Sequence, residues 1–259
     1  HIQTSFSKIL AEIDAAFPGG AALVTFTGSG AMLLSEHLKL PFVQEVIAAS
    51  TAVRKVIPQA DVAIELGGED AKLTFFSGGI DQRMNETCAG GTGAFIDQMA
   101  SLLKTDAAGL NELAREHKTL YPIASRCGVF AKTDVVALLN EGASRNDIAA
   151  SIFQAVVDQT IGGLACGRAI AGKVALLGGP LNFLSELRQR FIETLKLAPE
   201  EIIFPERAEQ FVAMGAALSG RGGEPSAFSD LLRSLKDLDQ SQFTAQSGAM
   251  PRLFKDEAE

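Results

Sequence analysis

Two cysteines in this chain each stand at the start of a segment that could bind a metal. Cys88 lies in the stretch Met84–Gly93, which continues through glycines into an amphipathic helical pattern. Cys127 precedes Gly128 and a second helix-like run. A thiolate at a helix N-terminus lies in a field that favours negative charge, so both thiols are suited to metal binding. Two cysteines cannot complete a four-thiolate site, so a shared iron–sulfur cluster would require a second copy of the unit.

The remaining cysteine and the histidines favour ordinary structural roles. Cys166 falls inside the longest predicted helix, where we expect a small, buried apolar residue. No pair of cysteines has the short CxxC spacing of a structural zinc site. His1, His37 and His117 have no ligand spacing to one another, and a catalytic pair of a cysteine with His117 has no supporting signature.

Three glycine-rich turns could bring bare backbone close to a nucleotide. Their candidate binding residues are Glu65, Gly67, Gly68, Gly91, Thr92, Gly93, Gly178 and Gly179. Glycines let backbone N–H groups approach a phosphate, and a carboxylate such as that of Glu65 can hold Mg²⁺ through water. Each turn alone also fits a tight hairpin, a loose helix start or a strand-to-helix turn. Three such turns in one α/β unit favour a nucleotide cleft.

Alternating strand and helix patterns are predicted to position these turns. Strands are expected at residues 22–26, 62–66, 72–76, 173–177 and 201–204, with a hairpin between the second and the third. Helices are expected at residues 7–17, 42–56, 93–103, 133–140, 182–195, 210–218 and 227–238, and the longest starts near Asn146 with Ser144 or Asn146 as its cap. This order predicts an α/β fold with mixed sheets. We expect the glycine turns to line one cleft, because ligands of open α/β sheets bind beyond the carboxyl ends of strands.

The composition bounds the class of protein. The chain has 259 residues, 47% of them hydrophobic, which is enough for a sizeable core in one large or two modest domains. The net charge of −8, without a basic stripe, argues against a nucleic-acid partner. The absence of a long apolar run predicts no transmembrane helix, and three cysteines without disulfide spacing fit a reducing cytoplasm. Residues 1–220 are expected to form the main unit, and residues 221–259 a linker and a polar tail.

Six segments of the chain resemble a known family. They are Ile64–Lys72, Met84–Gly93, Cys127–Leu139, Asn146–Arg168, Val174–Pro180 and Phe211–Leu218. In these segments the chain resembles the activator, or component A, of 2-hydroxyacyl-CoA dehydratases, in the BadF/BadG/BcrA/BcrD ATPase family. The resemblance covers residues 20–220. The two cysteine segments are specific to this family, whereas the glycine turns are generic.

The resemblance implies a fold, cofactors and partners. The implied fold is that of the actin-like ATPases, related to ribonuclease H. The implied assembly is a homodimer that holds a four-iron four-sulfur cluster through Cys88 and Cys127 of each unit. ATP or ADP with Mg²⁺ would bind at the glycine turns. The implied activity is ATP-dependent delivery of a low-potential electron to a dehydratase-like iron–sulfur partner.

The chain also departs from the family pattern. We expect it to lack the family's N-terminal phosphate hairpin, because it begins just after the position of that hairpin. Glu65 and Glu69 replace the family's Asp and Gln, and Lys132 replaces a family Glu. The tail segment Met250–Asp256 resembles the connection in large activases with two units in tandem, so we expect an excised first repeat. The alternative function is that of a non-catalytic actin-like scaffold or regulatory repeat. A sugar or acid kinase is disfavoured by the cysteine motifs.

Overall fold

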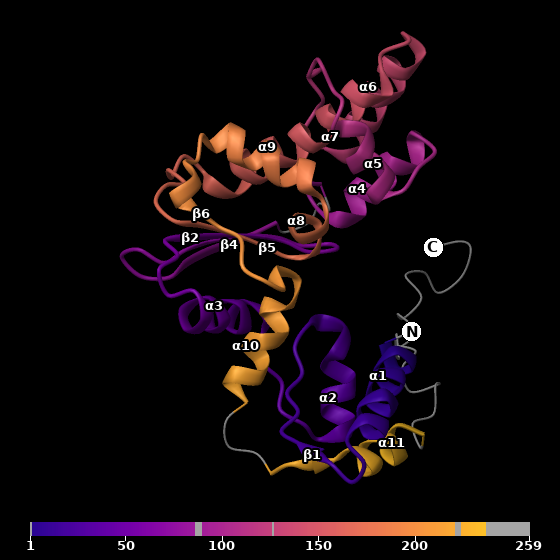
Figure 1. Ribbon diagram of the computed structural model, residues 1–259, viewed down its shortest axis with the longest axis vertical. Helices are drawn as coiled ribbons and strands as arrows, with labels where there is room; N and C mark the ends of the chain where they lie inside the picture. Colours follow the sequence, from indigo (N-terminus) through magenta and orange to yellow (C-terminus); the bar gives the residue numbers. More distant parts are fainter. Residues whose placement is uncertain (1, 86–89, 126, 221–223, 237–259) are drawn as a thin grey trace, which may run out of the picture. The chain divides into compact units, whose positions relative to one another are not determined.

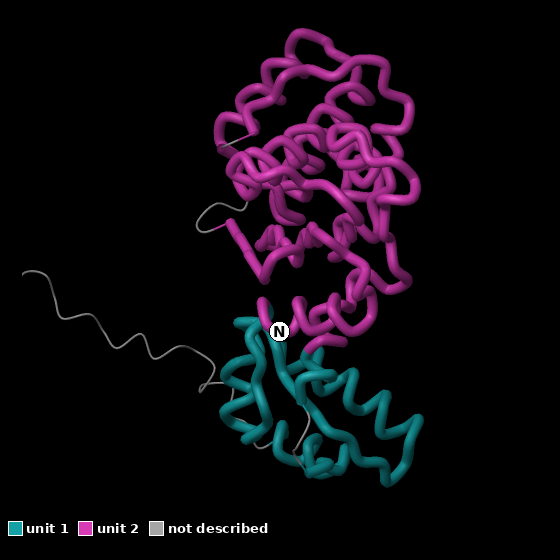
Figure 2. The backbone as a smooth tube through the Cα atoms, turned by 90° about the vertical axis from the view of Figure 1, so that its left-hand side faces the viewer, with its two compact units in different colours: residues 1–45, 216–259 teal, residues 46–215 magenta. Residues whose placement is uncertain are grey.

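The computed structural model describes residues 2–85, 90–125, 127–220 and 224–236, and it divides the chain into two compact units. Unit 1 consists of residues 1–45 and 216–259, and unit 2 of residues 46–215 (Figure 2). Cys88, residues 221–223 and the tail from residue 237 onward lie outside the described residues. The division of the chain at residue 220 into a main unit and a tail stays a prediction.

A five-stranded mixed sheet forms the centre of unit 2, and its strand order is β4-β3-β2-β5-β6. Figure 1 shows this sheet edge-on. The strands are β2 Val62–Leu66, β3 Ala71–Phe75, β4 Asp81–Met84, β5 Val174–Leu177 and β6 Ile202–Ile203. Neighbours among β2, β3 and β4 pair antiparallel, whereas β5 is parallel to β2 and β6 is parallel to β5. The predicted hairpin is confirmed, and Gly67 closes its turn by donating its N–H to the Asp70 carbonyl at 2.7 Å. The predicted α/β class with a mixed sheet is also confirmed.

Helices lie on both sides of this sheet (Figure 1). The longer ones are α3 Glu45–Val56, α4 Gly93–Leu102, α5 Ala107–Ala114, α6 Gly128–Asn140, α7 Arg145–Thr160, α9 Ser185–Leu195 and α10 Phe211–Ser219. The short ones are α8 Gly179–Phe183, the π-helix η2 Ile161–Ala165, and the 3-10 turns η3 Pro199–Glu201 and η4 Ala208–Gln210. The π-helix continues α7 without a break, so the whole helical stretch ends at Cys166.

Alternate residues of the strands point to opposite faces of the sheet and supply two cores. Ile64 and Leu176 are fully buried on one face, together with apolar residues of α4, α5, α7 and α9. Ala63 and Ala175 belong to the second core, with residues of α3 and the start of α10. Because every residue of β2 and β5 is buried, these strands are continuous apolar runs in the sequence, interrupted only by Glu65.

The central helix α7 begins as predicted. Ser144 caps it, and the Ser144 hydroxyl accepts a hydrogen bond from the Asn146 N–H at 3.3 Å. Within the described part of the chain, Arg145–Ala165 is the one helical stretch long and apolar enough to cross a membrane. However, 67% of its apolar window is buried inside the protein, so its apolar surface belongs to the core.

Unit 1 has a small core of its own. Its elements are α1 Ile2–Ala16, β1 Ala21–Ala22, the 3-10 turn η1 Ser29–Ala31, α2 Met32–Leu38, β7 Ser226–Ala227 and α11 Phe228–Lys236. Leu10, Leu34 and Phe228 are buried in this core. The ring of Phe6 meets that of Phe26 edge-on, with 5.1 Å between centroids. β1 pairs antiparallel with β7, so segments from distant parts of the chain complete this unit together.

The prediction of a buried strand at residues 22–26 is wrong. Strand pairing is confined to Ala21 and Ala22, and a single bridge joins Phe26 to Phe42. Leu23 is 49% exposed, so this apolar run does not enter a core as a continuous strand. The short partner β7 offers only two residues for pairing, which limits the length of β1.

Other elements differ in their extent. β4 was not predicted because its residues are polar, and it forms by pairing along the free edge of β3. The short helix α5 was also not predicted; Asp106 caps it by accepting the Gly109 N–H at 2.7 Å. The helix predicted at residues 182–195 is split into α8 and α9 at Leu184, which has an extended backbone. α6 begins at Gly128, directly after Cys127, instead of at residue 133.

Candidate functional site

The carboxyl ends of β2 and β5 lie side by side, and a cleft opens there. Glu65 is in register with Leu177 in this parallel pair, so the Gly67–Gly68 and Gly178–Gly179 turns follow at the same edge of the sheet. The cleft has a volume of about 540 Å³. Its lining residues are Gly68, Glu69, Gly93, Ala94, Ile96, Asp97, Ala107, Gly179, Pro180, Phe183 and Leu184. One glycine from each predicted turn therefore reaches the same cleft, as the strand order led us to expect.

The start of α4 is fastened directly to the hairpin turn. The Gly93 N–H donates to the Gly67 carbonyl at 3.0 Å, and the Ala94 N–H donates to the Gly68 carbonyl at 2.7 Å. A Cβ at Gly93 would lie 3.3 Å from the Gly67 oxygen, so a side chain at this position would push the two turns apart. These two N–H groups are therefore used to join the turns, whereas the sequence suggested that such groups would contact a phosphate.

The two glycines after β5 have different roles. Gly178 has a φ of 91°, and a Cβ there would collide with the Leu66 carbonyl oxygen. Its N–H donates to the Ala208 carbonyl at 3.0 Å, which fixes the end of the strand. At Gly179 a Cβ would come within 4 Å of one atom of the described residues beyond its chain neighbours and its own helix backbone, namely Cε2 of Phe183. Gly178 thus holds β5 against β2, while Gly179 leaves open space in the cleft.

Glu65, Gly91 and Thr92 stand beside the cleft without being among its described lining residues. The buried Glu65 carboxylate forms an ion pair with Lys72, with 3.2 Å between Oε1 and Nζ. Gly91 has a φ of 82°, and a Cβ there would lie 3.1 Å from Cγ of Gln159. Thr92 is fully buried as the N-cap residue of α4. These residues support the strand pair and the turn, and their direct contact with a nucleotide stays a prediction.

Among the lining residues that were not predicted as site residues, an aromatic ring and two carboxylates could contact a ligand. Phe183 is 72% exposed, so its ring is free to contact a ligand. Glu69 and Asp97 each place a carboxylate on the cleft wall. Asp97 lies four residues after Gly93 on α4, and helical spacing therefore turns it toward the same side. That spacing was visible in the sequence, whereas the exposure of an apolar ring at position 183 was not.

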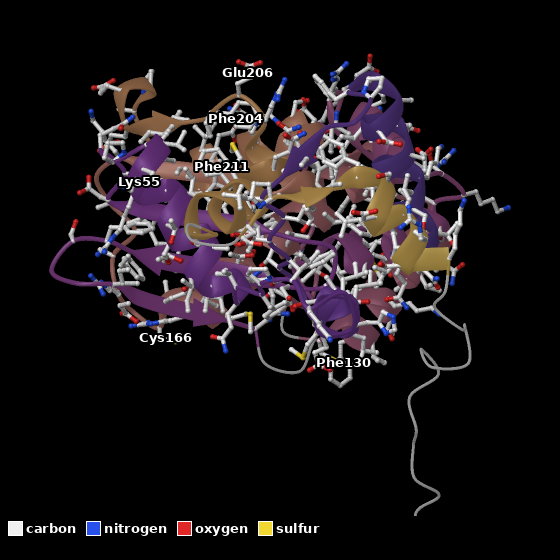
Figure 3. All side chains as sticks on the ribbon, turned by 90° about the horizontal axis from the view of Figure 1, so that it is seen from below. Lys55, Phe130, Cys166, Phe204, Glu206 and Phe211 are labelled. Carbon is white, nitrogen blue, oxygen red and sulfur yellow. The ribbon has the colours of Figure 1, made fainter. Side chains whose placement is uncertain are left out.

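Cys127 lies at the start of α6, in a position suited to a metal ligand. It is the N-cap residue, is partly exposed, and its side chain makes no capping hydrogen bond. The Ala124 N–H donates to Oδ2 of Asp134 at 2.8 Å, which ties the preceding segment to the helix. Val129 and Phe130 follow with 71% and 65% of their surface exposed, and the Phe130 ring projects outward in Figure 3. Cys88 lies outside the described residues, and the remainder contain no cluster of three metal-ligating side chains.

Cys166 is exposed, although we expected it to be buried (Figure 3). The helix widens into the π-helix Ile161–Ala165, and Cys166 then ends it in the left-handed conformation, with φ 47° and ψ 42°. A π turn adds a residue per turn and so rotates the next residues out of the buried stripe. Apolar periodicity in the sequence does not reveal this change of winding.

Comparison with protein families and curated proteins gives consistent matches. The model of the BadF/BadG/BcrA/BcrD ATPase family matches residues 2–220. The chain is 31% identical over 200 residues to the 2-hydroxyisocaproyl-CoA dehydratase activator of Clostridioides difficile, covering 75% of this chain and 72% of that protein. It is also 31% identical over 199 residues to the activator of lactoyl-CoA dehydratase of Anaerotignum propionicum, covering 74% and 73%.

Solved structures show the same relationship. Component A of the (R)-2-hydroxyglutaryl-CoA dehydratase of Acidaminococcus fermentans superposes with a TM-score of 0.68 at 29% identity, covering 80% of this chain and 76% of that one. The activator of the 2-hydroxyisocaproyl-CoA dehydratase from Clostridium difficile with bound ADPNP gives 0.71 at 27%, covering 90% and 84%. The ethanolamine utilization protein EutJ of Carboxydothermus hydrogenoformans gives 0.53 at 12%, over 83% and 72%, and is similar in fold alone. The predicted actin-like ATPase fold is confirmed.

Proposed function

This chain belongs to the BadF/BadG/BcrA/BcrD ATPase family, and from that premise we propose that it is an ATP-dependent activator unit that delivers a low-potential electron to a dehydratase-like iron–sulfur partner. The observation that carries the proposal is the cleft at the ends of β2 and β5, where Gly68, Gly93 and Gly179 meet. A similar activator has been solved with bound ADPNP. Those relatives are named as dehydratase activators, which supports a dehydratase as the partner.

The nucleotide, ATP or ADP with Mg²⁺, is proposed to bind in this cleft. The lack of side chains at Gly68 and Gly179 lets a phosphate or a sugar come close to the backbone there. The exposed Phe183 ring offers a face on which a base can stack. Glu69 and Asp97 supply the oxygen ligands that Mg²⁺ prefers, normally through water. Glu65, Gly67, Gly91, Thr92, Gly93 and Gly178 hold the surrounding backbone in place.

The four-iron four-sulfur cluster is proposed to be held by Cys88 and Cys127 of two units. The described part of this donor set fits: Cys127 has a free thiol at the N-terminus of the thirteen-residue helix α6, whose positive end favours a thiolate. The exposed apolar residues Val129 and Phe130 beside it favour coverage by a second copy of the unit. The bound cluster would supply one-electron transfer at low potential. Because such a site needs reduced thiols, we place the protein in the cytoplasm.

A second candidate function is a non-catalytic actin-like scaffold or regulatory repeat. The observation that favours it is the buried Lys72–Glu65 pair, which engages the carboxylate that the sequence assigned to Mg²⁺. In that case the chain keeps the actin-like fold, with its cleft and cysteine segments, but does not hydrolyse ATP. Iron content and nucleotide binding separate the two functions.

Anaerobic purification with iron, sulfide and visible-absorption analysis tests the proposal. A shared four-iron cluster predicts about two irons per chain and a broad visible absorption. Cys88→Ser and Cys127→Ser should each lose the iron, whereas Cys166→Ser is the matched control that retains it. A colourless, iron-free protein after anaerobic reconstitution would reject the activator in favour of the scaffold. Iron retained in full by Cys127→Ser would refute the ligand assignment.

A further inference from the structure

The short helix α8 forms one wall of the proposed nucleotide cleft. It contributes Gly179, Pro180 and Phe183 to the lining, and Leu184 follows directly after it. None of these four residues has a side chain that carries a charge or a hydrogen-bonding group. Such side chains offer nothing to a phosphate or a metal ion, whereas the exposed Phe183 ring suits the flat face of a nucleobase. The α8 wall is therefore the part of the cleft that can recognise the base.

The Phe183 ring requires a helix that is fixed in place. A helix of five residues is too short to be stable by itself, so neighbouring groups must hold α8. Its start is fixed by the hydrogen bond from the Gly178 N–H to the Ala208 carbonyl, and the fully buried Leu181 anchors its middle. At its end the backbone becomes extended at Leu184. The carbonyl groups of the last turn then need partners from outside the helix.

The side chain of Arg188 supplies these partners from the next helix, α9. Its Nη1 donates to the Leu181 carbonyl at 2.5 Å and to the Asn182 carbonyl at 2.8 Å. A positive group at the carbonyl end of a helix is also electrostatically favourable. Because Phe183 follows Asn182 in the chain, Arg188 fixes the backbone directly before the exposed ring.

The Arg188 guanidinium is itself held by an aromatic ring. Its Cζ lies 4.1 Å from the centroid of the Phe204 ring, within the range of a cation–π contact. Phe204 follows β6 directly. Desolvation lowers the pKa of Arg188, and the Glu186 carboxylate opposes this shift, so the guanidinium is partly withdrawn from water. Arg188 therefore joins three elements, namely α9, the segment after β6 and the end of α8.

From these contacts we propose that Arg188 is a positioning residue that holds α8 so that Phe183 stacks on the base of a nucleoside phosphate. This inference rests on the proposed nucleotide cleft and specifies which part of the ligand α8 recognises. Arg188 acts through α8, because it is not among the described residues that line the cleft.

Calorimetry with ADP and Mg²⁺ on the full chain tests this role. Phe183→Ala should raise the Kd for ADP at least about fivefold, which corresponds to the loss of one base stack. Arg188→Met keeps an apolar stem beside Phe204 but has no donor. It should raise the Kd at least about threefold, and by no more than Phe183→Ala does. In the Phe183→Ala background, Arg188→Met should have no further effect, because the ring that Arg188 positions is gone.

Two variants separate this role from a general loss of stability. Arg54→Met, at an exposed arginine of α3, is the matched control and should leave the Kd unchanged. Arg188→Lys keeps the positive charge but loses the planar group that serves both carbonyls and the ring. It should therefore also raise the Kd, and it provides the measurement where Arg188→Met does not fold.

The outcomes distinguish the positioning role from the function on which it rests. An unchanged Kd in Arg188→Met and Arg188→Lys would overturn the role and leave the nucleotide cleft standing. The same conclusion follows if Arg188→Met raises the Kd by equal factors with and without the Phe183 ring, since a merely structural effect is independent of that ring. A wild-type chain that binds no ADP would overturn both the positioning role and the proposed cleft.

Discussion

The adjacent glycines at the end of β5 allow the cleft to be tested separately from the fold. Gly179→Val adds a branched side chain where a Cβ would lie 4.0 Å from Cε2 of Phe183 and farther from the other described side chains. Its φ lies outside the left-handed region, so valine meets no backbone strain. Gly179 is the first residue of α8, and helix propensities differ by only about 0.5 kcal/mol between glycine and valine. We therefore expect the melting temperature to change by no more than about 2 °C.

The same valine should weaken nucleotide binding. Its methyl groups enter the space that the cleft leaves for a ligand, and overfilling a packed contact costs about 1–3 kcal/mol. This cost corresponds to a rise of about 5- to 150-fold in the Kd for ADP.

Gly178→Ala should instead lower the stability of the fold. The φ of 91° strains an alanine by about 1–3 kcal/mol, and its Cβ would collide with the Leu66 carbonyl oxygen. Relief of that collision requires β5 to shift against β2, which adds a cost of similar size. A total of about 3 kcal/mol would lower the melting temperature by about 6–12 °C.

Isothermal calorimetry with ADP, together with thermal melts followed by circular dichroism, measures both effects. The reasoning is refuted if Gly179→Val binds ADP as tightly as the wild type while melting at the same temperature, since the nucleotide would then lie elsewhere. A wild-type melting temperature for Gly178→Ala would show that the contact between Leu66 and Gly178 does not hold the strands together.

Three further predictions concern polar side chains that hold the fold of unit 2. Lys72→Met should destabilise the protein by about 3 kcal/mol, because Glu65 loses its ion-pair partner in a buried position; an unchanged urea midpoint would contradict this. The pKa of the Asp147 carboxyl is lowered in the folded protein, first by the hydrogen bond from the Lys118 N–H and then by that from the Thr119 N–H. The ionised carboxylate therefore stabilises the folded state fully above the unfolded pKa of about 3.9, and this contribution is lost as the pH falls through the lower folded pKa. Asp147→Asn should therefore show a smaller loss of melting temperature than the wild type between pH 7 and pH 2, and equal losses would reject the assignment. Ser144→Ala should cost about 1 kcal/mol by removing the cap of α7, measured by the same urea titration, and a neutral result would show that the cap is dispensable.

The strands that position the cleft were predictable from the chain alone. β2 was expected at residues 62–66 and lies there, because a short apolar run that ends in Gly67–Gly68 identifies a buried strand and its turn. Its return strand and the cap at Ser144 also follow from local patterns. β4 could not be predicted in this way, since its polar residues form a strand only because β3 offers a free edge.

The glycines of the candidate site could be predicted from the sequence, whereas the hydrogen bonds and the exposed ring around them could not. The order of strands brings Gly68, Gly93 and Gly179 to one cleft, as expected. The sequence did not reveal that the Gly93 N–H is used on the hairpin turn, or that Phe183 stands exposed on the cleft wall. These contacts depend on groups that are far apart in the chain, and no local spacing encodes them.

By itself, the sequence determined the family, the α/β class, the glycine turns and the cysteine segments, because turns, caps and apolar periods are set by neighbouring residues. Only the tertiary structure decided that Glu65 is buried against Lys72 and that Cys166 is exposed. Burial, exposure and pairing are properties of surfaces that meet only when the chain has folded, and they depend on the packing of the whole unit.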